Sequence, residues 1–374
     1  MSFLITFLAA MLAFSAVIAI HELGHFLAAK LCGIQVNEFS VGMGPALWHK
    51  VYHGTQYSLR ALPVGGFVAL EGEESPESQQ AEAARDAREA EQETDLEPQI
   101  PPEQRTGLPL NQAPIWQRMI VMSAGAVMNF VLGFVVLAVL IAAQNEPITS
   151  RVVYEIEPGA LCGQTGLVPR DEILEVNGRR CFVANDILYE LVRTESNQAD
   201  FTVRRDGELV ELPGVQFDTW QDEQGQTHMD IGFTVYGIER TPLNVLKEAG
   251  RSVLYYGRVI FTSLTDLLRG RESINDLSGP VGIVSAFGQA ARYGWRDLLE
   301  LVALITINLG IFNLLPFPAL DGGKVVFLLI EAVIGRPVPE KIQGALTIAA
   351  FALLFGLMLF ATYNDIIRLL SGAL

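Results

Sequence analysis

The sequence predicts a polytopic α-helical membrane protein with four transmembrane helices and an inserted extracytoplasmic α+β domain. Half of its 374 residues are hydrophobic and only 18% are charged, and the mean hydropathy is +0.31, which is typical of a membrane protein with a soluble part attached. Uncharged or weakly charged apolar segments of the kind that cross a bilayer cover residues 3–29, 119–143, 301–315 and 344–362. Between the second and third segments, short β-forming runs and turns indicate the separate domain.

The first transmembrane helix is expected over residues 1–30 and carries the motif His21-Glu22-Leu23-Gly24-His25 near its second end. No Lys or Arg precedes Lys30 and no small-residue cleavage site is evident, so the sequence favours a retained span over a cleaved signal peptide. On a helix, positions i and i+4 share a face, so both histidines can bind one metal ion while Glu22 lies beside it. This pattern indicates zinc together with a general base for hydrolysis.

Two other interpretations of the motif exist, a chance occurrence and a pair of surface histidines on a soluble helix. Ionisable side chains inside an apolar segment are energetically unfavourable and are usually functional. Because the motif interrupts such a segment, we favour the metal site.

A catalytic zinc ion takes three protein ligands and keeps one open position. The candidate third ligand is Asp321, which ends the stretch Asn-Leu-Leu-Pro-Phe-Pro-Ala-Leu-Asp at residues 313–321. The two prolines break the preceding helix, and the following Gly322 and Gly323 allow close backbone approach. Alone, this stretch is better explained as a helix end with an Asp cap. Together with the histidine motif it predicts one Zn²⁺ per chain, bound by two neutral imidazoles and a carboxylate. With a zinc-bound hydroxide these groups sum to a neutral cluster, which limits the cost of burial.

The net charge of −16 comes mostly from an acidic segment at residues 71–110. Its Glu, Asp, Ala, Gln and Pro composition offers little to bury and predicts a disordered, solvated cytoplasmic loop. The second transmembrane helix is expected after it, over residues 115–144. The chain is acidic and shows no basic stripe interleaved with aromatic residues, so nucleic acid is not expected as a partner.

Basic residues predict the orientation in the membrane. They gather between the first two spans and between the last two, at Lys30, Lys50, Arg60, Arg105, Arg118, Lys324, Arg336 and Lys341. The positive-inside rule then puts these two loops in the cytoplasm. The N-terminus and the central domain are therefore expected to be extracytoplasmic, and His21 to lie towards the cytoplasmic side.

The central domain is expected over residues 149–238. Its strand-like runs at residues 152–156, 172–176 and 201–203 are separated by turns such as Asn177-Gly178. The stretch 165–178 resembles the core of a bacterial PDZ domain, with Arg170 in place of the usual glycine. PDZ domains capture chain ends or extended peptides by strand addition. A purely structural β domain is the alternative, and Cys162 and Cys181 either pair or remain free thiols.

The rest of the chain is assigned in order. Residues 242–270 form an amphipathic helix that lies at the outer membrane surface or on the other spans, because Arg258 in its centre disfavours a fifth span. Residues 271–297 connect it to the third transmembrane helix, which is expected over residues 298–323 with the aspartate motif. The fourth transmembrane helix is expected over residues 343–370.

These motifs together resemble bacterial site-2 proteases of the branch that contains a PDZ domain and cleaves membrane-anchored anti-sigma factors and remnant signal peptides. Besides the zinc motif, the strongest match is the segment 308–323, and further matches lie at residues 37–68 and 278–283. The resemblance covers nearly the whole chain except the acidic segment. One departure is Ala126, which stands where the family's A-G-P-x-x-N pattern has proline.

The resemblance implies that His21, His25 and Asp321 bind zinc and that Glu22 is the base. It also implies a membrane-associated β-hairpin at residues 34–70, a location in the bacterial cytoplasmic membrane, and single-span membrane proteins as substrates after an upstream site-1-type protease has trimmed them. We therefore expect an intramembrane zinc endopeptidase that acts in regulated intramembrane proteolysis. The alternatives are a non-catalytic membrane PDZ scaffold or quality-control adaptor, and a metal transporter, for which no path lined by repeated acidic residues is evident.

A transmembrane substrate must unwind before its backbone can be attacked, and the edge of the hairpin is suited to hold it by strand pairing. Asn313 is a candidate substrate-binding residue that holds the extended chain or stabilises the developing oxyanion. The other interpretation of Asn313 is an inward-facing amide bonded to a neighbouring span.

Overall fold

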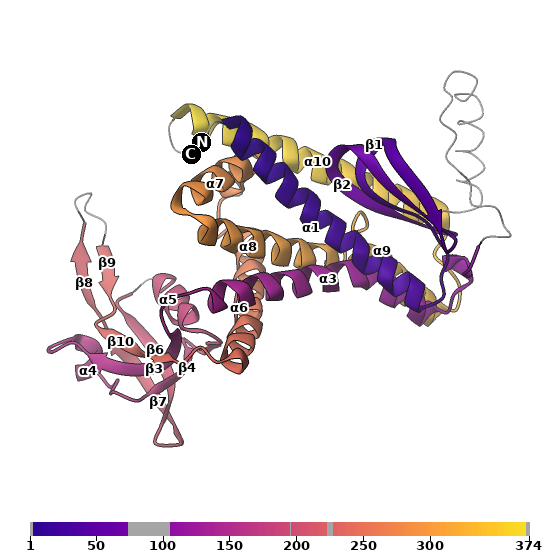
Figure 1. The fold of residues 1–374 in the computed structure, drawn as a ribbon. Helices are drawn as coiled ribbons and strands as arrows, with labels where there is room; N and C mark the ends of the chain where they lie inside the picture. Colours follow the sequence, from indigo (N-terminus) through magenta and orange to yellow (C-terminus); the bar gives the residue numbers. More distant parts are fainter. Residues whose placement is uncertain (1–2, 74–104, 195, 223–226, 372–374) are drawn as a thin grey trace. The chain divides into compact units, whose positions relative to one another are not determined.

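The computed structural model describes residues 3–73, 105–194, 196–222 and 227–371 (Figure 1). Most of the acidic segment for which the sequence predicts disorder lies outside these residues. The chain divides into two compact units, Met1–Gly133 with Phe261–Leu374, and Phe134–Ile260. Each unit is described by itself.

In the described part of the chain, four helices are long and apolar enough to cross a membrane: α1 (Phe3–Leu31), α3 (Ile115–Ala142), α8 (Trp295–Leu314) and α10 (Glu340–Ser371). The predicted fold class of four apolar helices with a β-rich insert is confirmed. Large apolar side chains such as Leu353 and Phe355 of α10 are exposed, as expected for a helix surface that faces lipid. A further helix, α9 (Asp321–Ile334), lies between α8 and α10, in a region to which the sequence analysis assigned no element beyond residue 323.

Helix α7 (Pro280–Tyr293) packs against α1, α8 and α10 (Figure 1). Its first turn donates a hydrogen bond from the Gly282 amide to Asp365 Oδ2 of α10, at 2.7 Å, and Asp365 is fully buried. A Cβ atom at Gly279 or Gly282 would lie within 2.9 Å of the same carboxylate. The glycines of the segment 278–283 therefore make room for a carboxylate that satisfies the helix N-terminus and complements its dipole.

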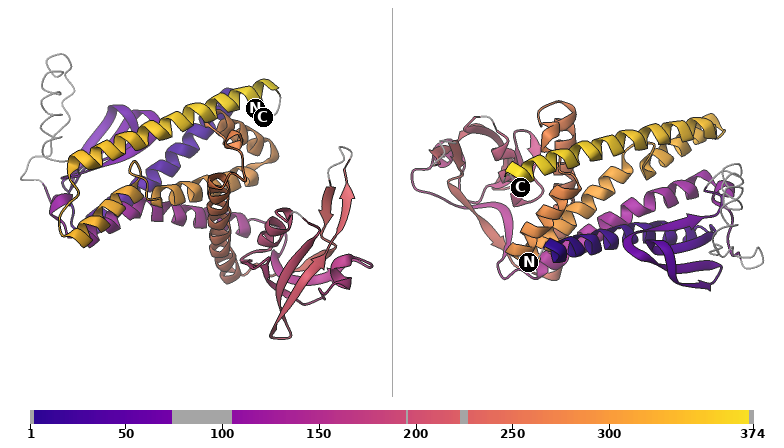
Figure 2. Two further views of the ribbon diagram at one scale, coloured as in Figure 1. Left: turned by 180° about the vertical axis from the view of Figure 1, so that it is seen from behind. Right: turned by 90° about the horizontal axis from the view of Figure 1, so that it is seen from above.

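The predicted hairpin consists of β1 (Val36–Tyr52) and β2 (Thr55–Leu70), which pair antiparallel through a two-residue turn at His53-Gly54. Both strands bend. Residues 55–60 pair with 46–52 on one side and with the start of β1 on the other, and residues 36–41 pair in turn with 66–70. The two bent strands therefore form one sheet, in which these segments lie side by side along α1 (Figure 2). Gly42, with φ 89°, sits at one bend, where a Cβ atom would lie 2.6 Å from the Leu62 carbonyl oxygen.

The start of this sheet is hydrogen-bonded to the residues that follow the acidic segment. The buried amide of Gln35 donates to the Gly54 carbonyl and accepts from the backbone N–H groups of Thr106 and Gly107. The Leu110 amide donates to the Glu71 carbonyl. The chain therefore leaves the sheet and comes back to it at the same place.

The second unit contains the predicted PDZ-like domain. Its main sheet has the order β10-β3-β4-β6-β7, and β5 pairs with β4. These strands are β3 (Ile148–Ile156), β4 (Glu172–Val176), β5 (Arg179–Arg180), β6 (Gln198–Arg205), β7 (Glu208–Gln216) and β10 (Phe233–Ile238), while β8 (Asp218–Gln221) and β9 (Thr227–Asp230) form a separate hairpin. The helices are α4 (Leu161–Gln164) and α5 (Ala184–Val192). The core contains Phe201, Phe217, Ile173 and Leu167.

Two sequence features of this domain have a local explanation. Arg170 adopts φ 76°, a left-handed conformation that glycine adopts most readily, which accounts for glycine at this position in PDZ domains.

Cys162 and Cys181 are both buried, free thiols, so the alternative of unpaired cysteines applies. Burial raises the pKa of Cys181 to about 12, which makes this thiol unreactive in the folded domain.

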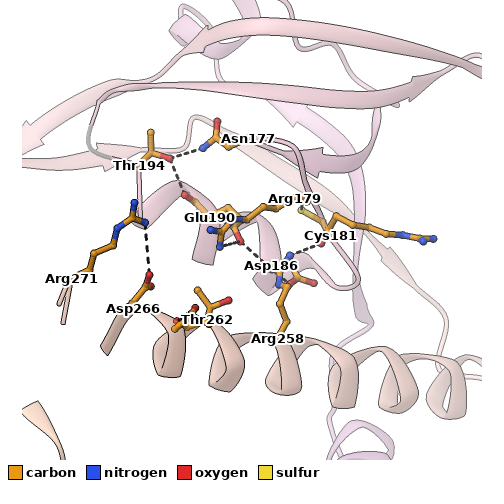
Figure 3. Close-up of polar contacts among 12 residues, drawn as sticks. Asn177, Arg179, Cys181, Asp186, Glu190, Thr194, Arg258, Thr262, Asp266 and Arg271 are labelled. Atoms are coloured by element: carbon orange, nitrogen blue, oxygen red, sulfur yellow. Dashed lines mark hydrogen bonds and ion pairs between the residues drawn. The ribbon is translucent and has the colours of Figure 1, made fainter. Parts of the chain in front are cut away.

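Helix α6 (Pro242–Leu268) is not among the described helices that are long and apolar enough to cross a membrane, and Arg258 in its centre has partners in the PDZ-like domain. Its guanidinium forms an ion pair with Asp186 of α5, lies 3.5 Å from Glu190 and donates to the Arg180 carbonyl (Figure 3). Asp186 also accepts from the backbone N–H groups of Phe182 and Val183 at the start of α5. A cation inside the apolar face of α6 is thus held by carboxylates of the PDZ-like domain.

We predict that Arg258→Met destabilises the docking of α5 on α6 by about 3 kcal/mol near neutral pH, because two buried carboxylates lose their cation. Burial raises the pKa of both Asp186 and Glu190, and Arg258 opposes these shifts. The raised pKa means that the folded state binds these protons more tightly than the unfolded state, so stability increases as the pH falls towards the unfolded values. The loss should therefore be smaller at about pH 5 than at about pH 7.5.

Hydrogen exchange of the α5 amides in the full chain, corrected for intrinsic rates, measures this effect. Arg179→Met is the matched control, because the Arg179 side chain is 41% exposed and lies 3.7 Å from Glu190, and it should cost less than about 1 kcal/mol. Equal losses at both pH values, or equal losses in both variants, would contradict the prediction.

Candidate metal centre

The two histidines of the zinc motif lie on one face of α1. Both are buried, with 7% of each residue exposed, and their rings are 4.8 Å apart at an angle of 76°. Their Nε2 atoms are 3.1 Å apart. The i, i+4 spacing of the two histidines on a helix therefore brings two candidate nitrogen ligand atoms close together.

Asp321 reaches this point from a break in the helical backbone. Helix α8 ends at Leu314 and α9 begins at Asp321. A Cβ atom on Gly322 would lie 2.2 Å from the Leu315 carbonyl oxygen, and one on Gly323 would lie 2.3 Å from that of Phe317. Only glycine permits this tight return, which carries Asp321 Oδ2 to 3.0 Å from His21 Nε2 and 3.3 Å from His25 Nε2.

The chemistry of this donor set fits a divalent cation. His25 Nδ1 lies 2.8 Å from the Val121 carbonyl oxygen, which can only accept, so Nδ1 carries the proton and Nε2 of the neutral ring has a free lone pair. That lone pair faces His21 Nε2 and Asp321 Oδ2. Ligand atoms of a tetrahedral zinc site are about 3.3 Å apart, from bond lengths near 2.0–2.1 Å. The observed triangle of 3.0, 3.1 and 3.3 Å matches this spacing.

Two amides surround the remaining nitrogen of His21. Asn129 of α3 is fully buried and its Nδ2 lies 3.2 Å from His21 Nδ1, while Asn313 Nδ2 of α8 lies 3.5 Å from the same nitrogen. Asn129 Oδ1 has no hydrogen-bond partner among the described residues. A half-turn of this amide lets Oδ1 accept the Nδ1–H of His21, which frees Nε2 for a metal. Asn129 is not among the site residues expected from the sequence.

Helices α1 and α3 cross closely beside the histidines. A Cβ atom on Gly24 would lie 2.4 Å from the Ala124 carbonyl oxygen, and one on Gly125 would lie 2.3 Å from His25 Nε2 and 2.6 Å from His21 Cε1. Small residues allow such close helix packing within a membrane. Gly125 leaves the space that the two imidazoles occupy.

A cavity of about 150 Å³ adjoins the three candidate ligands. It is lined by α1 at His21, Glu22 and His25, by the end of β2 at Phe67, Val68 and Leu70, by Glu73 just after β2, by Met122, and by Asp321 and Lys324 of α9. The Val68 amide donates a hydrogen bond to the Glu22 carboxylate. The candidate metal triad, the Glu22 carboxylate and a strand edge therefore all border one small cavity. Glu73, Val68 and Lys324 are not among the site residues expected from the sequence.

Known proteins show the same organisation over nearly the whole chain. The model of peptidase family M50 matches residues 9–357. A protein of Clostridium perfringens that carries the provisional name of a zinc metalloprotease is 34% identical over 360 residues, covering 96% of this chain and 97% of the relative. The regulator of sigma-W protease RasP of Bacillus subtilis is 31% identical over 424 residues, covering 98% and 99%. The zinc metalloprotease RasP of Geobacillus kaustophilus is 32% identical over 409 residues, covering 94% and 96%.

The match extends through both halves of the candidate metal site, from the histidine motif on α1 to the aspartate that opens α9. The chain therefore belongs to peptidase family M50 and is a multi-pass membrane zinc metalloprotease of the RasP type.

Proposed function

We propose that this protease is an intramembrane endopeptidase that cleaves the transmembrane segments of single-span proteins already trimmed outside the membrane. The observation that carries the proposal is the position of the candidate metal triad, His21, His25 and Asp321, on apolar helices and next to a strand edge. The relative named for regulation of sigma-W supports membrane-anchored anti-sigma factors as one substrate class, and remnant signal peptides are a second class with the same single apolar span.

In this proposal His21, His25 and Asp321 hold the zinc ion, which when bound supplies Lewis-acid activation of water and of the scissile carbonyl. Glu22 takes a proton from the attacking water as the new C–O bond forms. It then delivers that proton to the amide nitrogen as the C–N bond breaks, so the products are a carboxylic acid, which ionises by giving its proton to the amine, and the resulting ammonium. The hydrogen bond from the Val68 amide fixes the Glu22 carboxylate for both steps.

The outer edge of residues 66–70 is suited to hold the substrate. On their other side these residues pair with 36–41, and Phe67, Val68 and Leu70 line the metal cavity. An unwound transmembrane segment that adds to this edge as a strand regains backbone hydrogen bonds that it loses on unwinding. Its peptide bond then passes beside the metal triad.

The proposed orientation follows the basic residues of the sequence. The N-terminus and the PDZ-like domain are extracytoplasmic, and the metal site lies towards the cytoplasmic end of α1. A peptide-binding domain on that side would favour substrates whose outer part has been shortened by an upstream site-1-type protease.

Glu22→Gln should abolish cleavage while zinc remains bound, because the substitution removes the base and leaves all three ligands. A loss of at least about 100-fold is expected for a general base. The measurement is co-expression with a doubly tagged single-span reporter whose outer domain is truncated, with detection of the intramembrane fragment and metal analysis of the purified enzyme. The same reporter with its complete outer domain is the control for trimming. Cleavage by the Glu22→Gln variant at the wild-type rate would refute the mechanism.

Gly125→Ala should greatly lower the zinc content of the purified protein, since the new methyl group would overlap His25 Nε2. Gly344→Ala in α10 is the matched control, because a Cβ atom there meets nothing within 4 Å and alanine favours the helix. Metal analysis after dialysis against a weak chelator measures the difference. Equal zinc content in the two variants would argue against a metal at these histidines.

The two asparagines should separate metal binding from substrate handling. Asn129→Ala should weaken zinc affinity by about 10-fold or more, as expected when a buried partner of a ligating histidine is lost. Asn313→Ala should leave zinc affinity within about twofold, since the Asn129 amide lies nearer His21 Nδ1, and should lower turnover of the reporter. If Asn313→Ala instead loses zinc to the same extent, Asn313 is an interhelical amide that orients His21, and its substrate-binding role is wrong.

A further inference from the structure

The open side of the metal cavity is bounded by an ion pair. Lys324 Nζ donates to Glu73 Oε1 at 2.6 Å, and both residues line the cavity. Side-chain exposure rises along the cavity from 9% for the histidines and 16% for Asp321 to 27% for Glu73 and 48% for Lys324. The ion pair therefore lies between the buried triad and solvent.

The two partners come from different walls of the cavity. Lys324 lies in the first turn of α9, three residues after Asp321, and the close packing of Gly322 and Gly323 fixes the start of that helix. Glu73 follows β2 and the turn at Gly72, which has φ 76°. The pair thus connects the sheet beside the metal to the helix that supplies the third ligand.

This contact depends on the tertiary fold and not on local sequence, because 251 positions separate its two residues. Each partner also has an electrostatic effect on the site. The ammonium of Lys324 adds a positive charge to the same cavity as the two histidines, and Glu73 neutralises it. Half-exposed ion pairs are weak enough to open through thermal motion and strong enough to bias the closed state.

We propose that the Glu73–Lys324 ion pair is a latch across the open side of the metal cavity. When the latch is closed, it restricts exchange between the cavity and solvent. Water enters, and zinc or a cleaved chain leaves, when the two side chains separate. The inference rests on the proposed function in that zinc occupies the triad of His21, His25 and Asp321.

The test is the rate at which the zinc-loaded full chain in detergent loses zinc to excess 4-(2-pyridylazo)resorcinol, without substrate. Glu73→Gln and Lys324→Met should each release zinc about fivefold faster than wild type, as expected for loss of one half-exposed pair. The double variant should be no faster than either single one, because both remove the same interaction. Lys324→Arg keeps the cation and should release zinc at close to the wild-type rate.

Glu71→Gln is the matched control. It removes an ion pair with Arg105 two positions before Glu73, and Glu71 is not among the described residues that line the cavity. Wild-type release from this variant, together with the non-additive acceleration above, establishes the latch. Release at the wild-type rate from both single variants, additive effects in the double variant, or equal acceleration by Glu71→Gln overturns it. Zinc release tests the latch and does not depend on whether the wild type cleaves the reporter. Reporter cleavage by the Glu22→Gln variant would overturn only the proposed function.

Discussion

The structure depends on three candidate metal-ligand atoms that lie close together inside an apolar set of helices. His21 Nε2, His25 Nε2 and Asp321 Oδ2 lie within 3.3 Å of each other and are largely buried. Such an arrangement is repulsive unless a cation lies among the three atoms. Several neighbouring features serve to hold it. The Val121 carbonyl fixes one ring, the Asn129 amide orients the other, and Gly125 leaves room for both.

The candidate third ligand, Asp321, follows a break between two helices, and irregular backbone within a membrane is tolerated only where protein or a wet cavity satisfies it. Between α8 and α9 the Leu315 and Phe317 amides donate within the break, and the amides of Leu320 and Gly323 close the next turn. Gly322 lets the chain approach its own carbonyls. The break is therefore a hydrogen-bonded structure that aims Asp321, and it leaves α9 free to carry Lys324 to the mouth of the cavity.

The sequence predicted features whose cause is local. The spacing of His21 and His25 follows from helical geometry, the prolines and glycines around Asp321 predict a break, and the apolar segments predict the four long helices. Contacts that join distant segments were not predictable in this way. Nothing in the sequence near Arg258 indicates its partner Asp186, and nothing near Lys324 indicates Glu73, because these pairs depend on packing. The double bend of the hairpin escaped prediction for the same reason, although glycines such as Gly42 mark where it bends.

Three carboxylates, of the fully buried Asp186 and Asp365 and of the largely buried Asp321, face the same energetic problem and differ in how it is solved. Asp186 has the guanidinium of Arg258 and two backbone N–H groups, and Asp365 accepts from the start of α7. These carboxylates are balanced by donors that the chain itself provides, which is sufficient for a structural role. Asp321 instead faces two imidazole nitrogens, one of which has its proton committed to the opposite side of the ring. Its charge is available for a metal ion to balance, and this difference separates the candidate metal-binding carboxylate from the structural ones.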